Sequence, residues 1–209
     1  MNTKNKSLKY NILFIIIILL IIIYIKYDLK YPNNFEMIQL TSNKLNKKIL
    51  FEKQPIVIED QINDINDFIK YSMNNSLDYP IKNIKIIKNQ ETVYRNLSNF
   101  CYIQNNNKDD MWVYISHPKN SYKFNYNLTQ NTYDYLKTNY RIIDYNNIND
   151  SKFLKVKLYP KQIIILPKLW LYYIQNNNNE LNNNIKIYCI HSIIGFLVSN
   201  VYQFTKLSK

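Results

Sequence analysis

The stretch that decides the fold is Leu158-Tyr-Pro-Lys-Gln-Ile-Ile-Ile-Leu-Pro-Lys-Leu-Trp-Leu-Tyr-Tyr-Ile174. It contains two short apolar runs, Ile163–Leu166 and Trp170–Ile174, with polar turns before and between them. Runs of this length that are rich in Ile and Tyr and bounded by turn residues are typical of buried strands. We therefore expect two successive strands in this stretch.

Similar runs occur along most of the chain. They predict further strands at Ile84–Ile87, Phe100–Gln104, Trp112–Ser116, Phe153–Leu158 and Ile185–Ile190. Upstream, Glu52–Glu59 carries an apolar run introduced by Pro55, a residue that suits the first position of a strand. The closing stretch, Ser192–Phe204, suits either a helix or a strand, and we favour a helix.

One helix is expected directly after the first of these runs. Asp60 is a candidate N-cap, and the residues that fall on one face of the helix are Ile62, Ile65, Phe68, Ile69 and Ser72. The helix should end near Asn74-Asn75. Together these patterns predict one mainly β domain with flanking helices over residues 51–209.

The composition is biased toward residues with A/T-rich codons, which indicates an A/T-rich genome. The 209 residues include one Gly, Gly195, no Ala, and only two Arg among 27 basic residues. Phosphate-binding loops such as G-x-G-x-x-G are therefore excluded. Asn tolerates positive φ better than most residues, so Asn-rich segments such as 105–107 are expected to form the turns.

The formal net charge of +12 is carried by scattered Lys residues. Nucleic-acid sites usually gather basic residues on one face and favour Arg, whose planar group makes paired contacts with phosphate. The sequence shows no such stripe, so we do not expect nucleic acid as a partner. Membrane-associated nucleic-acid binding stays an alternative, and steep salt dependence of DNA or RNA binding would reveal it.

Residues 10–27 form the clearest local feature, an apolar segment with Tyr at both ends. Its length suits the core of a bilayer, and Lys26 can extend to the interface. A cleavable signal peptide is the alternative, but it needs small residues at a cleavage site, and the segment ends in Tyr24-Ile-Lys-Tyr-Asp-Leu-Lys30. We therefore expect an uncleaved transmembrane signal anchor that binds the lipid bilayer.

The flanks of this segment predict an orientation. Residues 1–9 carry three Lys, which favours a cytosolic N-terminus and a C-terminal domain in the lumen or outside the cell. Residues 28–50 are polar and predict a stalk between the anchor and the domain.

A lumenal domain would be open to N-glycosylation and would lie in an oxidising compartment. Asn-x-Ser/Thr sequons occur at Asn74, Asn96, Asn127 and Asn149, although such matches arise by chance in a chain this rich in Asn. The same compartment permits a bond between Cys101 and Cys189, and two buried free thiols are the alternative.

Three stretches resemble JmjC/cupin-like proteins. Gln54-Pro-Ile-Val-Ile-Glu59 is similar to their first strand, Met111-Trp-Val-Tyr-Ile-Ser-His-Pro-Lys119 to the strand that leads into their Pro-containing loop, and Pro160–Ile174 to their late Pro-x-x-Trp-Trp-His signature. The resemblance covers residues 51–205 and implies a compact double-stranded β-helix. With the anchor and the composition, the chain is similar to cupin-like proteins of giant DNA viruses, which implies a viral origin.

The chain departs from this family at its metal site. Active members hold Fe(II) with a His-x-Asp/Glu pair and a distant His, and they use 2-oxoglutarate. Here His117 precedes Pro-Lys and His191 precedes Ser-Ile, so neither starts such a pair. Tyr172 stands where the family has its distant His, and Lys161 stands where its preceding turn has Gly. The resemblance therefore implies a cupin-like scaffold without metal or cofactor.

No residue emerges as catalytic. His117 suits a strand-end residue with an ordinary hydrogen bond better than a general base, and His191 suits the edge of the core. Asp109 and Asp110 are adjacent, which favours a solvated turn over a paired-carboxylate site. Cys101 lies within an apolar strand, where an inert buried thiol is expected.

Trp170 and Tyr172 are the remaining candidates. In a cupin-like barrel alternate members of this aromatic patch would face the interior, and we favour ordinary core packing for Trp170 and Tyr172. The alternative is that they line a vestigial pocket that holds a small molecule or is filled by side chains. We expect a membrane-anchored protein with a binding or structural role. A divergent hydroxylase with unconventional ligands is the competing hypothesis.

Overall fold

The computed structural model describes residues 3–73, 78–81, 92–96, 98–123, 140–144, 152–175 and 185–192. The chain divides into two compact units, Met1–Lys30 and Tyr31–Lys209. The strand expected at 84–87 and the helix or strand expected after Ser192 lie outside the described residues.

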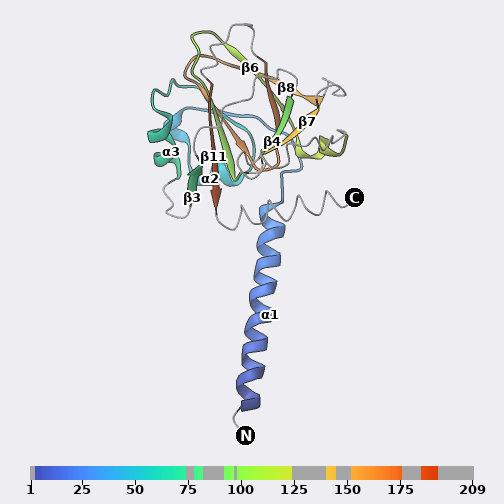
Figure 1. Ribbon diagram of the computed structural model, residues 1–209. Coiled ribbons are helices and arrows are strands. Elements are labelled where there is room, and N and C mark those ends of the chain that lie inside the picture. The colour runs from blue at the N-terminus through green and yellow to red at the C-terminus, as the bar shows by residue number, and fades with distance from the viewer. Residues whose placement is uncertain are drawn as a thin grey trace. The chain divides into compact units, whose positions relative to one another are not determined.

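The first unit is the helix α1 (Thr3–Asp28), shown in Figure 1. Its 18 residues from Tyr10 to Tyr27 are long and apolar enough to cross a membrane. At 1.5 Å per residue they span about 27 Å, close to the hydrocarbon thickness of a bilayer. Large apolar side chains are exposed all along this segment, as in Phe14, which is 64% exposed. A helix that is apolar on every side is suited to a transmembrane or signal-anchor segment.

The described strands of the second unit form two sheets (Figure 1). The first sheet has the strand order β1-β2-β9-β5-β11-β3, with β1 (Ile38–Leu40), β2 (Ile56–Ile58), β9 (Ile163–Pro167), β5 (Phe100–Asn105), β11 (Ile185–Ser192) and β3 (Asp78–Ile81). The second has the order β7-β4-β10-β6-β8, with β7 (Tyr140–Asp144), β4 (Thr92–Asn96), β10 (Leu171–Gln175), β6 (Met111–Ser116) and β8 (Leu154–Leu158). The pair β1–β2 is parallel, and the other pairs are antiparallel.

The main core lies between the two sheets. Along β9, Ile164 and Leu166 point into it, whereas Ile163 and Ile165 point to the opposite face of the first sheet. This alternation follows from the pleat of a strand. Because both faces of β9 are buried, the strand reads in the sequence as an unbroken apolar run.

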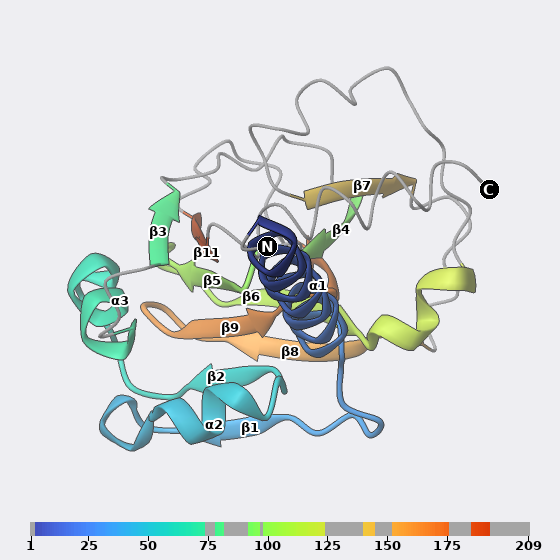
Figure 2. The same cartoon turned by 90° about the horizontal axis from the view of Figure 1, so that it is seen from below.

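Short helices cover the outer face of the first sheet. Leu50 of α2 (Lys47–Phe51) and Phe68 of α3 (Ile65–Met73) belong to the second apolar cluster, which also contains Ile163 and Ile165. Figure 2 shows α2 beside β1 and β2, with α3 at one end of the sheet. The mainly β fold with flanking helices is therefore as predicted.

The cap of α3 is corrected by the structure. Asp64, and not Asp60, accepts hydrogen bonds from the first turn, with its Oδ1 2.7 Å from the backbone nitrogen of Asn66. Asp60 instead accepts a hydrogen bond from the backbone N–H of Ser42 at 2.8 Å. That contact ties the loop after β2 to the short 3-10 helix η1 (Ser42–Lys44).

The stalk expected over residues 28–50 is also corrected. The boundary between the two units falls after Lys30, and β1, η1 and most of α2 lie within the supposed stalk. Although this segment is mainly polar, it contains three buried side chains, Leu40, Leu45 and Leu50. The folded domain therefore begins near Tyr31.

Candidate functional site

Trp170 lies where the chain crosses from β9 to β10 and has no exposed surface. Its indole Nε1 donates a hydrogen bond to the carbonyl oxygen of Lys53 at 3.0 Å. The rings of Phe35 and His117 meet it edge to face, with centroid distances of 5.0 and 5.1 Å. Both the polar and the apolar parts of this side chain are therefore satisfied within the domain.

Tyr172 points into the same core from β10, whereas Tyr173 points to the opposite face. The strand register places Tyr94 of β4 and Ile115 of β6 on either side of Tyr172. The rings of Tyr94 and Tyr172 are stacked, with centroids 5.5 Å apart. The Cys101 thiol lies 3.8 Å from the Tyr172 hydroxyl oxygen. Trp170 and Tyr172 are thus parts of one packed aromatic group between the sheets.

These residues do not fit the iron that active members of the resembled family hold. Ligands lie about 2 Å from a metal, so partners for a ligand at position 172 would come from the flanking strands. The inward residues there are Tyr94 and Ile115. Burial raises the pKa of Tyr94 to about 12, and neither a phenol nor an aliphatic side chain belongs to a facial triad of two His and one carboxylate. Throughout the described residues, no three or more His, Cys, Asp and Glu side chains are grouped to hold a metal ion.

His117 is held by two hydrogen bonds. Its Nδ1 accepts a hydrogen bond from the backbone N–H of Lys119 at 3.1 Å, so Nε2 carries the proton and donates to the carbonyl oxygen of Pro32 at 2.8 Å. The ring also lies between those of Tyr31 and Trp170. Burial lowers the pKa of His117, and nearby Lys119 acts in the same direction. This neutral imidazole holds the chain in place and has no nitrogen left for a substrate.

A pH dependence of stability follows from this environment. Because the pKa of His117 is lower in the folded state than its ordinary value of 6.5, the unfolded chain binds the proton more tightly. Stability is therefore fully present above about pH 6.5 and falls as the pH drops toward the folded-state pKa. Urea midpoints of the full chain measured at pH 7.5 and 5.5 should show the loss. It should disappear in His117→Gln and persist in His191→Gln; equal behaviour of the two variants would contradict the assignment.

Residues 31–36 form a strap over the Trp170 end of the core. Lys119 Nζ donates to the carbonyl oxygen of Asn33 at 2.7 Å, next to the His117 contact with Pro32. The side chain of Gln54 donates to the carbonyl oxygen of Asn34 at 2.9 Å and accepts from the backbone N–H of Glu36 at 3.2 Å. The domain thus closes this end of its core with its own backbone.

Asn96 organises the crossing from β9 to β10. Its Nδ2 donates to the carbonyl oxygens of Leu166 and Pro167 at 2.7 and 2.9 Å, and its Oδ1 accepts from the backbone N–H of Ser98 at 3.0 Å. Asn96 is 1% exposed. A glycan on this sequon is therefore incompatible with the fold; the sequons at 74, 127 and 149 lie outside the described residues.

Three described residues other than Gly adopt the left-handed conformation, namely Lys53, Lys161 and Leu169. Lys161, which stands where the family resemblance places Gly, has φ 68°, and Leu169 has φ 73°. The backbone N–H of each donates to an Asn carbonyl, Asn105 and Asn96 respectively, at 2.6 Å. Such positions normally cost about 1 kcal/mol or more for a residue with a side chain, so the surrounding contacts must hold them.

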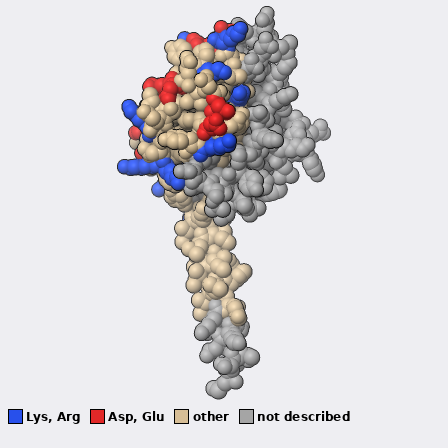
Figure 3. Space-filling model, turned by 90° about the vertical axis from the view of Figure 1, so that its left-hand side faces the viewer, with Lys and Arg blue, Asp and Glu red and all other residues tan. Residues whose placement is uncertain are grey.

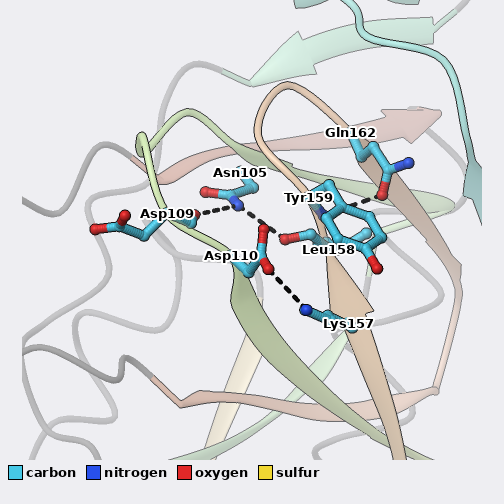
Figure 4. Close-up of polar contacts among 7 residues, drawn as sticks. All are labelled: Asn105, Asp109, Asp110, Lys157, Leu158, Tyr159 and Gln162. Carbon is cyan, nitrogen blue, oxygen red and sulfur yellow. Dashed lines mark hydrogen bonds and ion pairs between the residues drawn. The ribbon is translucent and has the colours of Figure 1, made fainter.

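Figure 4 shows the corresponding polar group at Asn105. Asn105 Nδ2 donates to the carbonyl oxygens of Asp109 and Leu158, both at 2.9 Å. The Asp110 carboxylate forms an ion pair with Lys157 at 2.8 Å. Asp109 and Asp110 therefore lie in a loop, as predicted, and their contacts are structural.

The charged residues do not form a nucleic-acid stripe on the face drawn in Figure 3. Lys and Arg side chains are interspersed with Asp and Glu on this face, which lies on the side of α3. Arg95, one of the two arginines of the chain, is 3% exposed in β4. Lys155 lies over the ring of Trp112 at 4.2 Å, a contact within the domain.

Sequence reasoning missed Tyr94, the strap and the role of Asn96. The signal for β4 was present, since Thr92-Val-Tyr94 are strand formers, but the run is short and polar residues flank it. His191 lies in β11 opposite Tyr79, and its side chain is outside the described residues.

A scan against family models finds none that matches this chain, and a search of curated proteins finds no significant sequence match.

Proposed function

We propose that residues 31–209 form a double-stranded β-helix of the cupin-like kind. Eight of the described strands can be numbered one to eight in chain order: β3, β4, β5, β6, β8, β9, β10 and β11. With these numbers, the first sheet contains the order 1-8-3-6. The second contains the order 2-7-4-5. This distribution of eight strands over two facing sheets is that of a jelly roll. β1 and β2 extend one sheet and β7 extends the other.

The protein is further proposed to be a membrane-anchored module with a structural or binding role and without a metal. The observation that carries this proposal is the pairing of Tyr172 with Tyr94 at the position where the family resemblance places a metal ligand. The stacked phenols and the fully buried Trp170 occupy the interior that a substrate would need. The competing hypothesis, a divergent hydroxylase, requires ligands other than these.

Iron analysis distinguishes the two hypotheses. The full chain, untagged and in detergent, is incubated anaerobically with Fe(II), desalted, and assayed for iron and for oxidation of 2-oxoglutarate. We expect no stoichiometric iron and no turnover, because the inward neighbours of Tyr172 do not form a facial triad. Stoichiometric iron with turnover would overturn the proposal, and loss of that iron in Tyr172→Phe would identify the ligand.

The proposed anchor has its own test. The full chain expressed in eukaryotic cells should stay with membranes after alkaline extraction, and Ile17→Lys with Leu20→Lys should release it, because charges at the centre of a span are costly. Glycosidase treatment should increase the gel mobility of the native chain if its domain is lumenal. A substitution that removes the sequon at Asn96 should leave the mobility shift unchanged, since Asn96 is buried. Absence of any shift would contradict the proposed orientation.

A further inference from the structure

Cys101 and Cys189 occupy directly opposite positions in two neighbouring antiparallel strands, β5 and β11. Both side chains point into the core between the sheets, and neither has exposed surface. The Cys189 thiol donates to Cys101 Sγ at 3.9 Å, and the two cysteines are not joined by a disulfide.

The backbone at this pair already suits a disulfide. Directly opposite residues in an antiparallel pair have Cα atoms about 4.5–5.5 Å apart, which lies within the range that disulfides span. Because both Cβ atoms project from the same face, rotation of the side chains can bring the two sulfurs together without moving either strand. β5 and β11 are interior strands of the first sheet, so pairing on both sides of each strand fixes the relative positions of the two cysteines.

We propose that Cys101 and Cys189 are a disulfide-forming site, closed when the domain folds in an oxidising environment. The oxidant is a disulfide, either oxidised glutathione or a protein dithiol oxidant. One cysteine thiolate attacks the oxidant and forms a mixed disulfide, and the second thiolate displaces the remaining thiol of the oxidant. The two cysteines lose two protons and two electrons, and the oxidant is reduced to two thiols.

The bond must form before the sheets close. In the folded domain, burial strongly raises the pKa of the Cys101 thiol, and the neighbouring Cys189 acts in the same direction. The attacking thiolate is therefore scarce in the native state, and the oxidant has no path to the buried pair. The same burial protects the completed bond from reductants. The inference goes beyond the proposed function, because it holds for any ligand or partner.

The test uses the full chain in detergent, unfolded in guanidinium and refolded with oxidised glutathione. Free thiols are then counted by alkylation under denaturing conditions, and the intact mass is measured. We expect no free thiol, a mass two hydrogens below that of the reduced chain, and a cross-linked peptide holding both cysteines. A chain that retains both thiols, or carries glutathione on either one, would overturn the proposal.

Thermal unfolding supplies the second measurement and its controls. The bond closes a loop of 88 residues, so the oxidised protein should melt about 10 °C above the reduced one. Reductant added to unfolded protein before refolding should abolish the difference. Cys189→Ala should melt at the same temperature under oxidising and reducing conditions. Cys101→Ala should behave in the same way, because either substitution removes one partner of the bond. An oxidised wild-type protein that melts at the temperature of the reduced form would contradict the proposed geometry.

Discussion

Replacement of Trp170 by alanine is expected to lower the free energy of unfolding by about 3–5 kcal/mol, the usual cost of removing a fully buried large aromatic side chain. The change removes the ring contacts with Phe35 and His117 and leaves the Lys53 carbonyl without its indole donor. It also opens a cavity beneath the strap. Urea unfolding followed by circular dichroism measures the loss.

Trp112→Ala is the matched control, because the chain contains just these two tryptophans. Trp112 is half-buried on the outer face of β6 and contacts Lys155, so its removal should cost roughly 1 kcal/mol. The pocket hypothesis makes the opposite prediction for Trp170. A variant that keeps its stability but loses a bound small molecule would show that Trp170 lines a ligand site and is not ordinary core.

Asn96→Asp is expected to cost about 3 kcal/mol or more, although it changes a single atom of the side chain. The amide nitrogen that donates to Leu166 and Pro167 becomes an oxygen, which faces two carbonyl oxygens at hydrogen-bond distance. A buried negative charge is thereby placed against two acceptors. Denaturant unfolding at pH 7 measures the loss, and protonation of the new carboxyl at lower pH should reduce it.

Asn106→Asp is the control for this substitution. Asn106 Oδ1 accepts a hydrogen bond from Lys161 Nζ at 2.6 Å, a contact that a carboxylate keeps and strengthens. Its effect should therefore lie within about 0.5 kcal/mol of zero. Equal destabilisation by the two substitutions would show that the crossing does not depend on the donors of Asn96.

The strands that could be predicted from sequence are those whose burial leaves a clear pattern. β9 and β10 can be predicted because large apolar or aromatic side chains fill positions on both faces of each strand. β1 was missed because it is three residues long, and its Gln39 interrupts the apolar run. Residues 31–36 have no apolar periodicity, since they bind the domain largely through carbonyl oxygens.

The candidate site could likewise be predicted from sequence only in part. The inward direction of Trp170 and Tyr172 follows from alternation along a strand, which the sequence displays. Their partners do not follow from it: His117 meets Pro32 across 85 residues, and Asn96 meets Leu166 across 70. Long-range contacts of this kind depend on strand order, which the residue pattern alone leaves open. Similarly, the expected N-cap, Asp60, instead contacts Ser42, which lies 18 residues away in the chain.

The strap also has a mechanical consequence. Tension entering the domain along the chain from Lys30 first reaches the carbonyl groups of Pro32, Asn33 and Asn34, which are held by three different side chains. These bonds share the load before it arrives at β1. Two of the three side chains, His117 and Lys119, belong to the segment that directly follows β6, so the force passes into the second sheet as well as the first. A pull on residue 31 is therefore resisted by both layers of the sandwich together.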